Sequence, residues 1–179
     1  MYSHIDSAVL AKAKKLKLLI LDVDGVLTDG KLFFDGEGNE YKAFHARDGH
    51  GIKLLRNAGV EVAVISGRKS ASVALRMQSL GVELIYQGYE DKRIAFDNLM
   101  AQLGLLPEQA AHVGDDLIDL PVMVRAGLAF AVNDAVAEVK QYADYCTNLS
   151  GGTGAVREVC DLILYAQGHS EQILANYLS

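Results

Sequence analysis

Two kinds of segment alternate along the chain, and this alternation constrains the fold more than any other feature. Short apolar runs rich in β-branched residues are separated by longer segments with the apolar period of a helix. Such alternation is the signature of βαβ units around a parallel sheet. We therefore predict an α/β fold, with a Rossmann-like parallel sheet and helices on both of its faces. The expected strands span residues 18–22, 60–66, 83–87, 110–115, 128–132 and 144–147, and the expected helices span 48–58, 69–80, 91–103 and 155–167.

Two of the expected helices carry typical capping residues. Asp48 and Asp91 stand where an N-cap is expected, and Gly59 and Gly104 follow the last helical residues. Aspartate accepts hydrogen bonds from the free N–H groups of a first turn, and glycine readily adopts the left-handed conformation that ends a helix. The sequence therefore predicts where both helices begin and end.

Length, charge and hydropathy narrow the class of protein. The 179 residues correspond to one domain at about 150 residues per domain, so we expect a single domain over 1–179. The formal net charge of −6 argues against nucleic acid as a partner, because that partner requires a broad basic surface. No apolar run approaches the roughly 18 residues of a membrane helix, and no signal-peptide cleavage pattern is present. We expect a cytoplasmic protein that binds neither membrane nor nucleic acid.

One stretch interrupts the alternation. Residues 31–45 (KLFFDGEGNEYKAFH) place two strand-like runs around the turn residues 35–39, which predicts an inserted β-hairpin. Several hairpin residues are large and apolar, and an isolated two-stranded hairpin is only marginally stable in water. We therefore expect the hairpin to pack against a partner surface.

Polar side chains follow the first expected strand at the edge where parallel sheets bind ligands. Asp22 and Asp24 come directly after this strand, with Thr28 in the following loop. Ligands of open α/β sheets bind outside the carboxyl ends of the strands. Two carboxylates this close favour a cation between them, and aspartate oxygens suit Mg²⁺. The sequence therefore predicts a Mg²⁺ site after the first strand.

Later strand ends add groups that suit a phosphate. The second strand ends at Ser66, followed by Gly67 and Arg68, so that a hydroxyl, a backbone N–H and a guanidinium can bind one anion. Lys92 lies in the first turn of a helix, where the helix N-terminus and the ammonium both favour an anion. The acidic pair 115–116 after the fourth strand would repel a phosphate unless it binds the same metal.

Taken in order, these groups resemble the four motifs of the haloacid dehalogenase superfamily of phosphohydrolases. The closer resemblance is to the small phosphatases of phosphorylated keto sugar acids, and it covers roughly residues 17–165. The intervals between the motifs leave no room for a cap domain, so the resemblance implies a capless core. The strings that carry it are DVDGVLTDG at 22–30, the hairpin at 31–45, RDGHGI at 47–52, ISGR at 65–68 and GDDLIDLPVM at 114–123.

The resemblance implies a role for each matching residue. Asp22 would be the nucleophile that forms an aspartyl-phosphate, and Asp24 would be the general acid and base. Ser66 and Lys92 would bind the phosphoryl oxygens. The implied metal ligands and their support are Asp22, Asp24 through its backbone carbonyl, Asp115 and, behind them, Asp116.

The resemblance also implies a reaction and an assembly. We expect Mg²⁺-dependent hydrolysis of 3-deoxy-D-manno-octulosonate 8-phosphate in lipopolysaccharide precursor synthesis. We also expect a homotetramer built through the hairpin, in which neighbouring subunits and their residues 150–156 complete each site. The expected substrate-binding residues are Thr28, Ser66, Gly67, Arg68, Arg76 and Lys92.

Other interpretations stay open. The 9-phosphate of a related nonulosonic acid would suit the same motifs. A phosphoacceptor switch also combines acidic residues, a hydroxyl and a lysine on a parallel sheet, but its acceptor follows the third strand, where this chain has Gln87 and Gly88. Asp119 is interpreted as either a helix cap or a site residue, and His112 as a buried core histidine. No role is assigned to residues 1–16 and 168–179.

Overall fold

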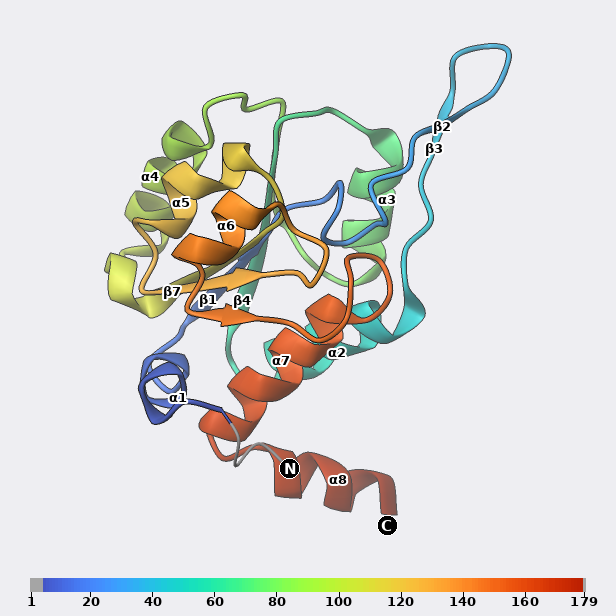
Figure 1. Cartoon of the computed structure of the whole chain (residues 1–179). Helices are drawn as coiled ribbons and strands as arrows, with labels where there is room; N and C mark the ends of the chain where they lie inside the picture. The colour runs from blue at the N-terminus through green and yellow to red at the C-terminus, as the bar shows by residue number, and fades with distance from the viewer. Residues whose placement is uncertain (1–4, 179) are drawn as a thin grey trace.

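The computed structural model, which describes residues 5–178, has a central sheet of six parallel strands (Figure 1). The strands lie in the order β5-β4-β1-β6-β7-β8, so the first strand of the chain occupies the middle of the sheet. The strands are β1 (Leu18–Leu21), β4 (Glu61–Ser66), β5 (Leu84–Gln87), β6 (Ala110–Gly114), β7 (Leu128–Ala131) and β8 (Tyr145–Cys146). All six expected strands are confirmed to within one or two residues at either end.

Helices connect the strands and cover the sheet. The α-helices are α1 (Ser7–Ala13), α2 (Ala46–Asn57), α3 (Ala71–Ser79), α4 (Lys92–Leu103), α5 (Leu120–Met123), α6 (Ala137–Tyr142), α7 (Ala155–Ala166) and α8 (Ser170–Leu178), and the 3-10 helices are η1 (Pro107–Gln109) and η2 (Leu117–Asp119). The four expected helices correspond to α2, α3, α4 and α7. Helices α1 and α8 lie in segments to which the sequence assigned no role.

The two faces of the sheet pack into two separate cores. Successive side chains of a strand point to opposite faces. Leu19 of β1 therefore packs in the larger core with Ile52 of α2 and Val159 of α7, whereas Ile20 packs in the smaller core with Phe96 of α4. The expected α/β fold with helices on both faces is confirmed.

The expected N-cap at Asp91 is confirmed, whereas the one at Asp48 is wrong. The Asp91 carboxylate accepts a hydrogen bond from the Arg93 N–H at 3.0 Å. Helix α2 begins at Ala46, so Asp48 lies inside its first turn, and its carboxylate instead accepts the backbone N–H of Arg157 at 2.8 Å. Helix α7 starts after Gly154, which has no side chain for capping. Asp48 of α2 therefore caps α7.

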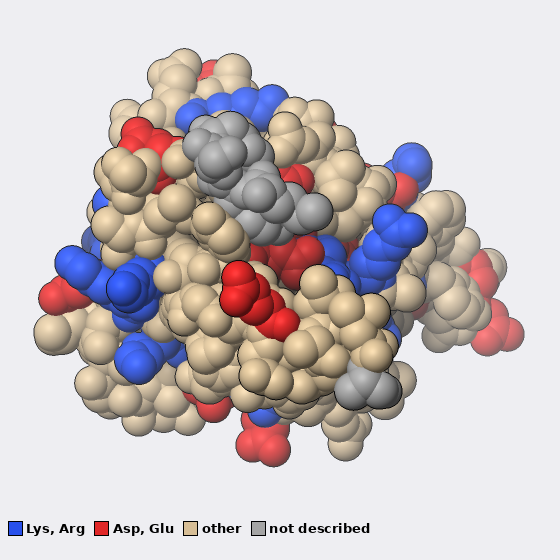
Figure 2. Space-filling model, turned by 90° about the horizontal axis from the view of Figure 1, so that it is seen from below, with Lys and Arg blue, Asp and Glu red and all other residues tan. Residues whose placement is uncertain are grey.

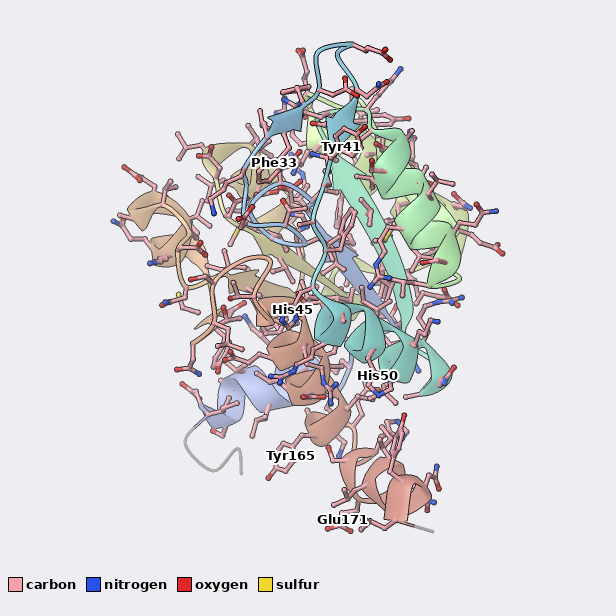
Figure 3. All side chains as sticks on the ribbon, turned by 90° about the vertical axis from the view of Figure 1, so that its right-hand side faces the viewer. Phe33, Tyr41, His45, His50, Tyr165 and Glu171 are labelled. Atoms are coloured by element: carbon pink, nitrogen blue, oxygen red, sulfur yellow. The ribbon has the colours of Figure 1, made fainter. Side chains whose placement is uncertain are left out.

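The expected hairpin is present as a separate two-stranded sheet, β2 (Phe33–Phe34) paired antiparallel with β3 (Glu40–Tyr41). It projects from the α/β core (Figure 1), and Figure 3 shows Phe33 and Tyr41 at the end of the molecule opposite α8. Asp35 organises the turn, because its carboxylate accepts the backbone N–H groups of Glu37 and Asn39, both at 2.9 Å. Phe33 and Tyr41 are half exposed, so one copy of the chain leaves the hairpin without the partner surface expected for it.

Lys and Arg are interspersed with Asp and Glu on the face that Figure 2 shows. No helix within residues 5–178 has both the length and the apolar character needed to cross a bilayer.

We predict that Asp48→Ala lowers the free energy of unfolding by about 1–2 kcal/mol, the usual effect of losing a helix cap. Asp48→Asn retains an oxygen that can accept the Arg157 N–H and should lose much less. Urea denaturation of the two variants measures the difference. Equal stability of Asp48→Ala and the unchanged protein would contradict the capping role.

The contribution of Asp48 to the free energy of unfolding should depend on pH. Burial raises the pKa of Asp48 above its usual range, against the hydrogen bond from Arg157. Because the folded pKa exceeds the unfolded one, the contribution of Asp48 is fully present below the unfolded pKa and is lost as pH rises through the folded pKa. The stability of the unchanged protein relative to Asp48→Asn should therefore fall with rising pH.

Candidate active site

The order of the strands brings the predicted catalytic residues together. Strands β4 and β6 flank β1, so the residues that follow these three strands meet at one edge of the sheet. They line a cavity of about 170 Å³. The residues around this cavity are Asp22, Asp24, Ser66, Gly67, Arg68, Asp115, Asp116 and Ile118.

Asp22 is held at the end of β1 by a buried ion pair. Its backbone N–H continues the sheet by donating to the Val113 carbonyl at 3.1 Å. Its carboxylate lies 2.6 Å from the ammonium of Lys92, the first residue of α4, and the Lys92 side chain is fully buried. Burial and the nearby Asp119 carboxylate raise the pKa of Asp22 to about 7, against the attraction of Lys92. Lys92 therefore orients Asp22 and supplies the local positive charge.

Asp119 fixes Lys92 from the other side. One oxygen of its fully buried carboxylate lies 2.7 Å from the Lys92 ammonium, and the other accepts the backbone N–H of Asp115 at 3.0 Å. Burial opposes the charged form, but hydrogen bonds and charges of His112 and Lys92 hold the pKa of Asp119 below its usual range. Of its two sequence interpretations, the structure supports the site residue. The spacing of GDDLID, with a third carboxylate four positions after Asp115, was the signal for it.

His112 is a core histidine, as expected, but it also contacts this network. It is fully buried on β6, and its Nε2 lies 2.9 Å from the Asp119 carboxylate. Burial lowers the pKa of His112, against its hydrogen bond to Asp119. Because a carboxylate only accepts hydrogen bonds, Nε2–H is the donor of this contact. Its Nδ1 has no hydrogen-bond partner among the described residues. The histidine thus helps to orient the carboxylate that holds Lys92.

The acidic residues fit a divalent metal ion. Carboxylate oxygens of Asp22, Asp115 and Asp119 lie within 4.8 Å of one another. Burial and the other two carboxylates raise the pKa of Asp115 to about 8, which is the repulsion that a bound cation would remove. Gly25 leaves the space for Asp115, because a Cβ at this glycine would lie 2.0 Å from the Asp115 Oδ2. Hard oxygen ligands of this kind suit Mg²⁺.

Ser66 and Arg68 lie at the end of β4 as predicted. The Ser66 side chain is buried at the cavity, and its Oγ accepts the backbone N–H of Arg68 at 3.3 Å. The Arg68 guanidinium is about half exposed, and it binds the Glu40 carboxylate of the hairpin at 2.7 Å. A hydroxyl and a guanidinium are therefore available to an anion that enters the cavity.

Asp24 faces the hairpin. Its carboxylate forms an ion pair with Lys42, and its other oxygen lies 3.7 Å from the Arg68 Nε. Glu40 joins both cations, because one of its oxygens lies 3.2 Å from the Lys42 ammonium and 2.7 Å from Arg68. The sequence interpretation missed Glu40 and Lys42. Glu40 and Lys42 are two positions apart, and positions two apart in an extended segment face the same side. This spacing was the signal that could have identified them.

Three predicted site residues have other surroundings in the structure. Thr28 is buried, and its hydroxyl accepts the Gly30 N–H at 3.2 Å, so it closes the loop after β1. Arg76 on α3 lies against Gly49 of α2, where its guanidinium is 2.2 Å from an ideal Cβ position. Neither residue lines the cavity. Asp116 lines it, but its carboxylate caps η2 through the Leu117 N–H at 2.7 Å, so Asp119 rather than Asp116 contacts Lys92.

Comparisons with known proteins identify relatives along almost the whole chain. Haloacid dehalogenase-like hydrolases match residues 82–158. The 3-deoxy-D-manno-octulosonate 8-phosphate phosphatase of Escherichia coli K12 is 50% identical over 171 residues, which cover 96% of this chain and 91% of that protein. The crystal structure of the phosphatase of the same name from Yersinia pestis has a TM-score of 0.91 at 47% identity, covering 92% of this chain and 89% of that chain.

A third relative has bound ligands. The 3-deoxy-D-manno-octulosonate 8-phosphate phosphatase of Moraxella catarrhalis was crystallised with a magnesium ion, a phosphate ion and a KDO molecule. It has a TM-score of 0.93 at 41% identity, covering 94% of this chain and 97% of that chain. These matches confirm the resemblance read from the motifs. Because they extend over almost its full length, the chain belongs to the haloacid dehalogenase superfamily and, within it, to the family of 3-deoxy-D-manno-octulosonate 8-phosphate phosphatases.

Proposed function

We propose that this protein is a Mg²⁺-dependent phosphatase that hydrolyses 3-deoxy-D-manno-octulosonate 8-phosphate to the free sugar acid and phosphate, in lipopolysaccharide precursor synthesis. The observation that carries the proposal is the buried pairing of Asp22 with Lys92 beside Asp115, at the edge of the sheet where ligands bind. The relatives named above favour this substrate over the 9-phosphate of a nonulosonic acid and over a phosphoacceptor switch.

In the mechanism proposed, each step of phosphoryl transfer depends on a residue of the site. The Asp22 carboxylate attacks the phosphorus, and the bond between phosphorus and the sugar oxygen breaks as an aspartyl-phosphate forms. Asp24 gives a proton to the leaving oxygen and then removes one from the water that hydrolyses the aspartyl-phosphate. Ser66 and Lys92 bind the phosphoryl oxygens, which is the positioning and charge stabilisation on which this reaction depends.

Mg²⁺ would be held by Asp22, Asp115 and the backbone carbonyl of Asp24. When bound, it neutralises the charge of the phosphate and of the carboxylate that approaches it. Asp119 is already engaged by Lys92, His112 and two backbone N–H groups. It therefore orients its neighbours and is not assigned as a ligand.

Substrate selection would rest on the cation at the mouth of the cavity. Arg68 is the predicted substrate residue that lines the cavity and is exposed there, with 47% of its side chain accessible. Its present partner is the carboxylate of Glu40, so the carboxylate of a keto sugar acid can take the same place. The assignments of Arg76 and Thr28 to substrate binding stay predictions.

The assembly proposed here is a homotetramer built through the hairpin. Its support is the exposed apolar surface of the hairpin, where Phe33, Phe34 and Tyr41 are 50%, 57% and 58% exposed. Such a projecting surface is typical of a site of protein association. A neighbouring subunit would also cover the cavity, which a capless core leaves open. The cytoplasmic location stays a prediction from the sequence.

We predict different outcomes for the two aspartates after β1. Asp22→Asn removes the nucleophile and should abolish the phosphoenzyme, whereas Asp24→Asn should lower turnover by about 10² to 10⁴, the usual contribution of general acid–base catalysis. Phosphate release and trapping of the phosphoenzyme measure the two effects. Asp97→Asn, an exposed position on α4, is the control. Full activity of Asp22→Asn would contradict the mechanism.

We predict that Mg²⁺ raises the melting temperature of the unchanged protein. EDTA should remove this shift and abolish the phosphatase activity. A ligand that binds only the folded state stabilises it by mass action. Asp115→Asn should lose the Mg²⁺-dependent shift, whereas the Asp97→Asn control should keep it. Thermal melts with and without Mg²⁺ make the comparison. An equal shift in Asp115→Asn would exclude Asp115 as a ligand.

We predict that Arg68→Ala lowers kcat/KM for the sugar acid phosphate roughly ten- to a hundred-fold, the loss expected for charge-assisted hydrogen bonds of about 1.5–3 kcal/mol. Turnover of p-nitrophenyl phosphate, which has no carboxylate, should change much less. Lys69→Ala is the matched control, since it removes the neighbouring cation. Equal losses on both substrates would place Arg68 on the phosphate, and comparable turnover of glucose 6-phosphate by the unchanged protein would refute the substrate.

A further inference from the structure

Lys42 occupies an unusual position for a hairpin lysine. It directly follows β3, yet only 1% of its side chain is exposed. Its ammonium contacts the carboxylates of Asp24 and Glu40. Burying an ammonium carries a desolvation cost that only close, well-placed partners offset. Lys31, by contrast, pairs with Asp29 at the surface, where 71% of the Lys31 side chain is exposed. This pair carries no such desolvation cost.

The surroundings of Asp24 make Lys42 its main restraint. Its only other cation among the described residues is Arg68, which is 3.7 Å away and about half exposed. Solvent screens an exposed pair at this distance, so it holds a side chain weakly. Without the Lys42 ammonium, the Asp24 and Glu40 carboxylates would lose the cation between them and repel each other. The Asp24 carboxylate would then turn away from its present direction.

The hairpin stem in turn holds Lys42. Glu40 binds Lys42 and Arg68 through one carboxylate oxygen, and its backbone carbonyl accepts the Ser72 hydroxyl of α3 at 3.3 Å. The stem is therefore attached to the loop after β4 and to α3. Through these contacts, the position of the hairpin determines where Lys42 stands beside Asp24.

We propose that Lys42 is a positioning residue for the phosphatase reaction: its buried ammonium holds the Asp24 carboxylate toward the oxygen of the leaving group, and Glu40 holds Lys42. This inference rests on the proposed function, because it assumes that Asp24 transfers the proton. A general acid works only within hydrogen-bond reach of its target, and a displacement of about 1 Å can lower a rate by about 10². Lys42 itself touches no reacting atom.

The test compares substrates that differ in their need for a proton. Lys42→Met keeps the length of the side chain and removes the ammonium. It should lower kcat/KM for the sugar acid phosphate by about ten- to a hundred-fold, with a much smaller loss on p-nitrophenyl phosphate, because nitrophenolate departs without a proton. Lys42→Arg should restore part of the activity. Lys53→Met, which removes an exposed lysine of α2 outside the hairpin, should match the unchanged protein.

A double variant shows whether Lys42 acts through Asp24. If it does, Lys42→Met combined with Asp24→Asn should be no slower than Asp24→Asn alone, since both remove the same proton transfer. Additive losses would overturn the proposal, as would equal losses of Lys42→Met on the two substrates. Should Lys42→Met fail to fold, Glu40→Gln carries the same test, because it removes the carboxylate that holds Lys42.

Failure of this inference differs from failure of the proposed function. If Asp24→Asn lowers kcat/KM mainly for the sugar acid phosphate and Lys42→Met does not, only the positioning role is refuted. If the loss of kcat/KM in Asp24→Asn does not depend on the leaving group, the assignment of Asp24 as the general acid fails, and the role of Lys42 fails with it.

Discussion

The fully buried ammonium of Lys92, between the carboxylates of Asp22 and Asp119, is the interaction on which the rest of the site depends. Without it, two carboxylates would share a buried space with no cation, an arrangement that costs several kcal/mol per ion. The three charged residues also join three elements, since Asp22 follows β1, Lys92 begins α4 and Asp119 ends η2. One charge thus holds Asp22, the proposed nucleophile, and Asp119 in place.

The sheet makes this charge cluster possible, because the residues that stabilise the sheet are different from the residues that form the site. The side chains of β1 are apolar and fully buried on both faces, so the strand is held by the two cores. Polar residues begin only where the strand ends, in the loops at the carboxyl edge. Because β4 and β6 flank β1, the ends of these two strands supply Ser66, Arg68 and Asp115 to the site. None of these three residues belongs to either hydrophobic core.

The hairpin links the site to the surface of the molecule. Strands of two residues each are too short to be stable alone, and the structure supports them by contacts at the stem. The same contacts place Glu40 and Lys42 beside Asp24 and Arg68. The apolar side chains of the hairpin strands, Phe33, Phe34 and Tyr41, are left exposed. One insertion therefore supplies charges to the site and also carries an exposed apolar surface.

The sequence by itself determined the strands, the helices α2, α3, α4 and α7, and the catalytic candidates, because all of these are encoded locally. The apolar period predicts β1, and the residues directly after it, Asp22 and Asp24, follow from their place at its end. Contacts between distant positions needed the tertiary structure. The cap that Asp48 gives to α7 joins residues 109 positions apart, and Asp119 meets Lys92 from 27 positions away. A charged residue in a sequence has many possible partners, and only the packing of the elements selects the one that offsets its burial.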